Sequence, residues 1–189
     1  IAPPSDESMA WWRAEMKEAE IWWLEDAVKF IDGRQFPNNK WFSNVDNLSA
    51  GDKATLKDEL KAQMPYPLLK WQKGYMDRYR SGMDQAGSIQ DVLDQIEWIN
   101  SDIMNRLNHD QVAELKKYGD AAIARINAMW VENFTTRMNT ASYEGLLYEV
   151  AYDVAESSDL TAAQKADLKK KIEARMPVLK TDSEIIAVK

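Results

Sequence analysis

One eighteen-residue segment occurs twice in this chain, at residues 48–65 and again at residues 160–177. The two copies read LSAGDKATLKDELKAQMP and LTAAQKADLKKKIEARMP, and nine of the eighteen positions are identical without a gap. A shorter third copy, LNHDQVAELKK, begins at Leu107 and keeps the frame L-x-x-x-Q-x-A-x-L-K-K of the last copy. The unit therefore recurs every 53 to 59 residues, which is typical of a tandem-repeat protein.

The repeated segment has the pattern of a capped helix. A hydroxyl residue, Ser49 or Thr161, stands where an N-cap accepts a backbone hydrogen bond. The apolar positions four residues apart are Leu56 with Leu60, and Leu168 with Ile172. Both strong copies are predicted to end at their Met-Pro pairs, 64–65 and 176–177, because proline disfavours helical conformation in the residue before it.

Helical patterns occupy most of the remaining chain. We expect one long helix from about Asp6 to Asp32, with Gly33 as its left-handed stop. The other expected helices are a short one capped by Asn39 and those from about Pro67 to Gln85, from Ser88 with Asp91 in a capping box, from Asn108 to a break at Gly119, from Asp120 to about Met138, and over 142–156.

These patterns predict an all-α fold made of tandem three-helix-bundle repeats, with about nine helices and no sheet. The expected modules are a Trp-rich one over 1–66, a second over 67–119, and a third over 120–189 that includes a C-terminal tail. A module of this size buries only about 60% of the surface that its unfolded chain exposes, so neighbouring modules are expected to contribute stability.

The charge distribution excludes some classes of function. The net charge of −7 and a pI near 4.9 argue against binding a nucleic-acid backbone. Residues 84–105 and 141–159 each contain five acidic residues and no basic one, whereas 161–180 contains six basic residues and two acidic ones. No run of eighteen apolar residues occurs, so no membrane span is expected.

Residues for catalysis or metal binding do not form a recognisable pattern. Cysteine is absent, and the single histidine, His109, is expected at an exposed helix start, so neither a zinc site nor a nucleophile with its base is indicated. The seven glycines are scattered and form no phosphate-binding loop. We therefore expect a protein that is not an enzyme and that holds no cofactor and no metal.

The eight tryptophans are the most informative residues for binding. Adjacent helical residues point about 100° apart, so only one member of each doublet, Trp12 and Trp23, is expected in the core. The other members of the doublets, Trp11 and Trp22, are eleven residues apart and would share one face of a continuous helix. That face would pack against another module or form an aromatic patch. The candidate binding residues are Trp11, Trp22, Trp41, Phe42 and Trp71.

The segment LTAAQKADLKKKI resembles an element of the three-helix FIVAR and GA modules of bacterial cell-surface proteins, L-T-x-x-Q-K-x-x-L-K-x-x-I. The resemblance is carried by Leu160, Thr161, Gln164, Lys165, Leu168, Lys169 and Ile172, and in the first copy by Leu48, Ser49, Lys53, Leu56, Lys57 and Leu60. It covers about a third of the chain and implies a helical surface module, without carrying over any binding residue. The eight tryptophans depart from the usual composition of those modules.

Two hypotheses of function follow. The first is a non-enzymatic helical repeat protein that acts as a binding or spacer module at a bacterial cell surface or in the extracellular space, with a protein or a glycan on its aromatic patch. The alternative is a structural subunit that self-assembles into a filament, a shell or a larger complex. The chain begins without Met, as expected for a mature end left by signal-peptide removal or for an artificial boundary, so a cytoplasmic location stays open.

Overall fold

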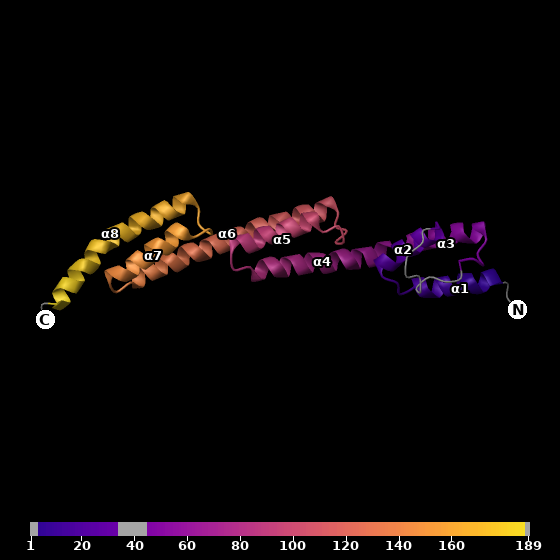
Figure 1. Ribbon diagram of the computed structural model, residues 1–189, viewed down its shortest axis with the longest axis horizontal. Helices are drawn as coiled ribbons and strands as arrows, with labels where there is room; N and C mark the ends of the chain where they lie inside the picture. Colours follow the sequence, from indigo (N-terminus) through magenta and orange to yellow (C-terminus); the bar gives the residue numbers. More distant parts are fainter. Residues whose placement is uncertain (1–3, 34–44, 188–189) are drawn as a thin grey trace. The chain divides into compact units, whose positions relative to one another are not determined.

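The computed structural model describes residues 4–33 and 45–187, which form helices and no strand (Figure 1). The helices are α1 (Pro4–Met16), α2 (Ile21–Ile31), α3 (Ala50–Gln63), α4 (Pro65–Gln85), α5 (Ile89–Ser101), α6 (His109–Thr140), α7 (Glu144–Glu156) and α8 (Ala162–Ala187). The chain divides into two compact units. The first unit comprises Ile1–Asp77 with Ile103–Leu107, and the second comprises Arg78–Asp102 with Asn108–Lys189.

The N-terminal stretch is two helices, so the single helix predicted from Asp6 to Asp32 is wrong. A turn at residues 17–20 separates α1 from α2. The break lets Trp12 of α1 pack on Trp23 of α2, with ring centroids 5.8 Å apart, which two residues eleven positions apart on one helix could not do. Gly33 follows α2 at a φ of +88°, in agreement with the predicted left-handed stop.

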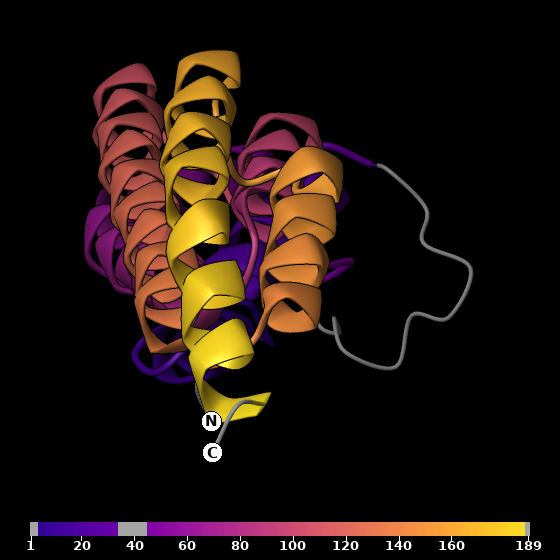
Figure 2. The ribbon, with the colours of Figure 1, turned by 90° about the vertical axis from the view of Figure 1, so that its left-hand side faces the viewer.

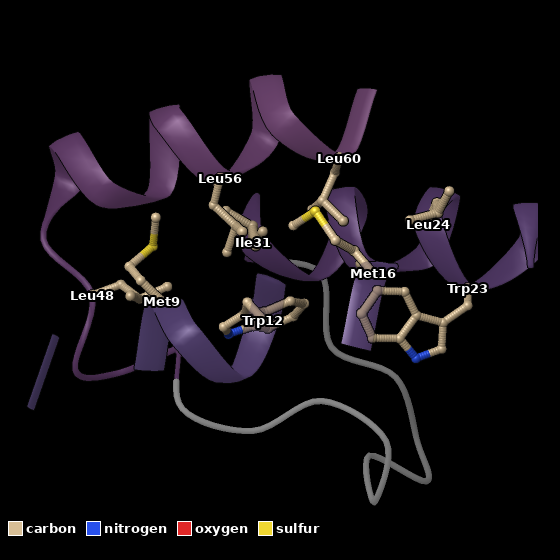
Figure 3. Close-up of a cluster of buried hydrophobic side chains, with 10 residues drawn as sticks. Met9, Trp12, Met16, Trp23, Leu24, Ile31, Leu48, Leu56 and Leu60 are labelled. Carbon is tan, nitrogen blue, oxygen red and sulfur yellow. The ribbon is translucent and has the colours of Figure 1, made fainter. Parts of the chain in front are cut away.

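The core of the first unit lies between α1, α2 and α3 (Figure 3). Trp12, Leu56 and Leu60 are completely buried there, and Leu48 contributes from just before α3. The predicted N-cap is confirmed: Ser49 Oγ accepts a hydrogen bond from the backbone N–H of Asp52, and Asp52 caps Ser49 in return. The hydrogen bond from Ser49 lowers the pKa of Asp52, because it stabilises the charged carboxylate.

The first Met-Pro pair ends α3, although the backbone stays helical through it. Met64 has φ and ψ of −60° and −36°, and its carbonyl accepts a hydrogen bond from the backbone N–H of Leu68 in α4. Pro65 is the first residue of α4, where a missing N–H costs no intrahelical bond. The prediction of a helix end here is confirmed, and the following helix ends at Gln85 as expected.

Residues 103–107 form a short segment that is fastened to the first unit by side chains of α4 and α2. Trp71 Nε1 donates to the carbonyl of Met104 at 2.8 Å, and Gln72 Nε2 donates to the carbonyl of Arg106 at 2.6 Å. The Arg106 guanidinium forms a two-pronged ion pair with Glu25, with bonds of 2.6–3.1 Å, and lies 5.3 Å from the centroid of the Trp71 ring. The hydrogen bond with Glu25 raises the pKa of Arg106 above its ordinary value.

Arg106 holds this segment at a conformational cost, because its φ of +53° lies in the left-handed region that side chains disfavour. We expect Arg106→Ala to lower the free energy of unfolding of this unit by about 1 kcal/mol, since a partly buried, charge-assisted pair is lost while some backbone strain remains. Arg106→Lys keeps the positive charge but cannot form the two-pronged contact with Glu25. It should therefore recover less than half of the stability that Arg106→Ala loses. Hydrogen exchange of the backbone amides at 104–107 measures the stability loss in both variants. Unchanged protection in Arg106→Ala would show that Arg106 does not hold this segment.

In the second unit, α5 and α6 form an antiparallel pair with the expected caps. Ser88 accepts from the N–H of Asp91 at 3.2 Å, and Asn108 accepts from the N–H of Gln111 at 2.9 Å. The predicted break at Gly119 is wrong, because α6 runs through it without interruption. Gly119 is buried, and a Cβ there would lie 2.8 Å from Cδ1 of Ile96, so this glycine allows α5 to approach α6 closely.

Helices α6, α7 and α8 pack side by side around a second core (Figure 2). Its completely or almost completely buried members include Leu147, Leu168 and Ile172. The second Met-Pro pair was predicted to end its helix, and this prediction is wrong: α8 continues through Pro177. Leu179 is buried in the same core, so packing beyond the proline favours helical conformation that the proline itself disfavours.

A network of hydrogen bonds connects the start of α5, the middle of α6 and the start of α8. The largely buried Asp159 accepts a hydrogen bond from the first N–H of α5, at Ile89, over 2.7 Å. Asn127 of α6 donates to the carbonyl of Asp159 at 2.7 Å and exchanges two hydrogen bonds with the amide of Gln164. Gln164 also accepts from Thr161, which confirms the predicted cap at that residue.

The sequence is all-α over the described residues, as predicted. These residues form eight helices: the turn at 17–20 adds one helix to the expected set, the unbroken α6 removes one, and the short helix expected near Asn39 lies outside the described residues. The expected module boundaries near residues 66 and 119 fall inside α4 and α6, and the division into three modules stays a prediction.

Candidate functional site

The predicted aromatic residues occupy different environments. Trp41 and Phe42 lie outside the described residues. Trp11 is half-buried and meets Trp12 edge to face, with ring centroids 5.2 Å apart. Trp22 is 39% exposed, and its Nε1 donates to the Glu20 carboxylate at 2.6 Å. Because the turn at 17–20 separates their helices, the expectation that Trp11 and Trp22 share one helix face is wrong.

Trp71 has a structural role in its own unit. Its indole N–H is bonded to the Met104 carbonyl, and its ring carries the Arg106 guanidinium on one side and approaches the Tyr75 ring at 5.5 Å. The ring therefore holds residues 103–107 in place, which leaves less of it for a partner than the sequence indicates.

A cavity of about 260 Å³ opens between α4 and α5 in the second unit. The wall from α4 consists of Arg78, Tyr79, Ser81, Gly82 and Gln85, and the other wall consists of Gln95 and Trp98 of α5 and of Asp102, which follows α5 directly. The cavity is smaller than a drug-sized site, which spans about 300–1,000 Å³. Its lining combines two aromatic side chains, Trp98 and Tyr79, with a guanidinium, two amides and a carboxylate, so it can offer both a stacking surface and hydrogen bonds.

Gly82, one of the lining residues, makes room for the side chain of Gln95. A Cβ at that position would lie 2.8 Å from Oε1 of Gln95 and 3.0 Å from its Cδ, so the glycine leaves the space in which the Gln95 amide lies. Across the cavity, the Tyr79 hydroxyl donates to Asp102 at 3.2 Å, which fixes both groups. In the described part of the chain, Arg78 and Gln95 form no ion pair or side-chain hydrogen bond, so both are available to a ligand.

Trp98 is the residue that the sequence reasoning missed. It is 59% exposed on α5, although tryptophan usually buries most of its surface. A signal was present, since Trp98 stands beside Ile99 and off the apolar stripe of Val92, Ile96 and Ile99. Its partners across the cavity come from a different helix, and the sequence does not indicate that arrangement.

The described residues were also compared with the requirements of a metal site and of a membrane span. Over residues 4–33 and 45–187, no three carboxylate or histidine side chains converge as metal ligands would. Among the described helices, none combines the length and the apolar character needed to cross a bilayer. His109 is exposed in the first turn of α6, as expected.

Comparison with known proteins gives no relative. No protein-family model matches the chain, and neither the curated proteins nor the solved structures contain a match.

Proposed function

We propose that this chain is a non-enzymatic, tandem three-helix repeat protein of a bacterial exterior that acts as a binding and spacer module. The observation that carries the binding role is the cavity at Trp98, with its exposed ring and available Arg78 and Gln95 side chains. The bacterial exterior is supported by the resemblance of residues 160–172 to an element of the FIVAR and GA modules.

The repeat supports the spacer role. Each copy places a capped helix, α3, α6 or α8, against the helix that precedes it in the chain. A buried leucine lies at the same position in each copy: Leu56, Leu115 and Leu168. Repetition of this kind adds length by stacking units and builds no central cleft. Several charged groups also hold helices together, as in the pairs of Arg13 with Glu59 and Arg137 with Asp153.

The chemistry of the Trp98 cavity fits one residue of a saccharide. A pyranose ring has an apolar face that stacks on an indole and hydroxyl groups that bond to amides and carboxylates. The free guanidinium of Arg78 favours a sugar that carries a carboxylate, because the two can form a charge-assisted pair. A uronic acid at the end or within a chain is therefore the class of ligand that we propose.

The test is a titration with glucuronate and with glucose, monitored in a ¹H–¹⁵N spectrum by the side-chain amide of Gln95 and the backbone amides of 95–102, which every variant retains, and by the Trp98 indole where it is present. We expect glucuronate to bind with a Kd on the order of 1 mM, or about −4 kcal/mol, and glucose to bind more weakly. Trp98→Ala should abolish binding of both sugars. Arg78→Gln should weaken glucuronate at least tenfold and leave glucose unchanged, since only the ion pair is lost.

Trp22→Ala is the matched control, because it removes an exposed tryptophan on α2 and leaves the cavity intact. This variant should bind both sugars as the native chain does. The proposal fails if neither sugar moves the Trp98 signal, or if the control loses binding to the same degree as Trp98→Ala.

A further inference from the structure

The outward face of α7 carries three exposed aromatic rings. We name Tyr143, Tyr148 and Tyr152 the tyrosine row; they are 53%, 59% and 67% exposed. The opposite face of α7 is buried in the second unit through Leu147 and Val150, so the row points away from that core. Tyrosines in such a position are typical of protein interfaces, where each supplies a large rigid surface and one hydroxyl.

Local contacts organise the row. A Cβ at Gly145 would lie 2.8 Å from Cε2 of Tyr143, so the Tyr143 ring lies over this glycine. Positions 145, 148 and 152 follow one another on one helix face, which brings the Tyr143 ring into line with the other two rings. The Tyr148 hydroxyl donates to Glu144 at 2.9 Å and limits the motion of that ring. The surface is thus partly fixed before any partner binds.

The charge around the row is negative. Glu149 and Glu156 are exposed on the same side, and α7 contains no lysine or arginine. Arg137 of α6 is paired with Asp153 at 2.6 Å, and Lys165 of α8 donates to the Ala155 carbonyl at 2.7 Å. Electron-rich rings beside carboxylates attract ammonium and guanidinium groups, by cation–π contact and by ion pairing.

The complementary surface is on α8 of the same sequence. Lys169 is 74% exposed, and its amine is 4.0 Å from Glu173, at the limit of an ion pair. Lys170 is also exposed and forms no ion pair with any described residue. Two adjacent lysines with loosely held charges therefore lie next in the chain to an acidic helix with exposed rings.

We propose that the tyrosine row binds α8 of a second copy of this chain around Lys169 and Lys170, which point about 100° apart and reach the row from two sides. The contact pairs Glu149 and Glu156 with the two lysines and places the lysine stems on the tyrosine rings. This goes beyond the proposed saccharide site, which lies between α4 and α5 and shares no residue with the contact. Because the net charge of −7 repels copies at long range, the association is weak and local, with a Kd on the order of 100 µM.

Sedimentation velocity of the full chain at low ionic strength tests the proposal by charge exchange. The first variant, Glu149→Lys with Glu156→Lys, reverses the acidic side, and the second, Lys169→Glu with Lys170→Glu, reverses the basic side. Each alone should weaken association at least tenfold, and an equimolar mixture should restore it, because the reversed surfaces complement each other.

Two further variants sharpen the result. Tyr148→Ser with Tyr152→Ser keeps every charge and should still weaken association, with helicity checked by circular dichroism. Asp94→Lys with Glu97→Lys makes the same charge change on α5 and should associate at least as well as the native chain. A native chain that stays monomeric near 1 mM at low salt, a mixture that stays monomeric, or a decalysine peptide that binds the row while the protein itself does not associate would each overturn the proposal.

Discussion

Alanine in place of Trp12 is expected to cost the first unit about 3 to 5 kcal/mol of unfolding free energy, as large-to-small changes of a buried tryptophan do. The indole is completely buried, and it contacts α2 through Trp23 and Phe30, with ring centroids 5.8 Å and 6.5 Å away. Small domains have only about 5 to 15 kcal/mol of stability in total, so this unit would be left close to unfolding.

Hydrogen exchange measured by mass spectrometry resolves this effect along the chain. Since each 1.4 kcal/mol is tenfold in an equilibrium constant, protection of the amides in α2 and α3 should fall by about two to three and a half orders of magnitude. Trp22→Ala is the control: the residue is partly exposed, and its loss should cost no more than about 1 kcal/mol. Equal loss of protection in the two variants would contradict the assignment of Trp12 as the centre of the core.

Gly119→Val is expected to destabilise the second unit by about 1 to 3 kcal/mol, although glycine is a poor helix former. A Cβ at this position would already lie 2.8 Å and 3.2 Å from two atoms of Ile96 and 3.6 Å from Met83. Two further methyl groups force α5 and α6 apart or push Ile96 out of its place. Urea unfolding followed by circular dichroism measures the loss.

A second substitution identifies the cause. Ile96→Ala removes the side chain that the added valine would meet. The stability loss of the double variant Gly119→Val with Ile96→Ala should therefore be smaller than the sum of the two single losses by about 1 kcal/mol or more. Gly119→Ala should be nearly neutral, because its gain in helix propensity offsets a contact with the flexible end of Ile96. Additive losses in the double variant would show that the glycine is not required for close packing.

Four of the helix starts were predictable because their signals are local. Ser49, Ser88, Asn108 and Thr161 each cap a helix through the residue three positions later, and such pairs are visible in the sequence. The stops were less predictable. Gly119 and Pro177 both disfavour helix, yet each lies within a continuous helix. Tertiary packing outweighs propensity in both cases: Gly119 packs against Ile96, and Leu179, just beyond Pro177, is buried in the second core.

The turn at residues 17–20 shows the opposite error. Its sequence, Lys-Glu-Ala-Glu, favours helix, and the N-cap residue of α2, Glu20, forms no side-chain cap. The reason for the break lies in the tertiary contact of Trp12 with Trp23, which no local pattern contains. The cavity at Trp98 was missed for the same reason, because its lining comes from two helices, with five residues from α4 and the other three from α5 and the position directly after it.

The short segment held by Arg106 and Trp71 has a consequence for dissecting this protein. The chain leaves the first unit at Asp77, supplies α5 to the second, returns for residues 103–107, and leaves again. No single cut can therefore separate the two units intact: a fragment that ends at Asp77 lacks the partner of Glu25, and one that begins at Asn108 lacks α5 and the α4 residues beneath it. Either fragment, produced alone, would be an incomplete fold. Its measured stability would reflect the loss of the missing segment as well as the properties of the unit itself.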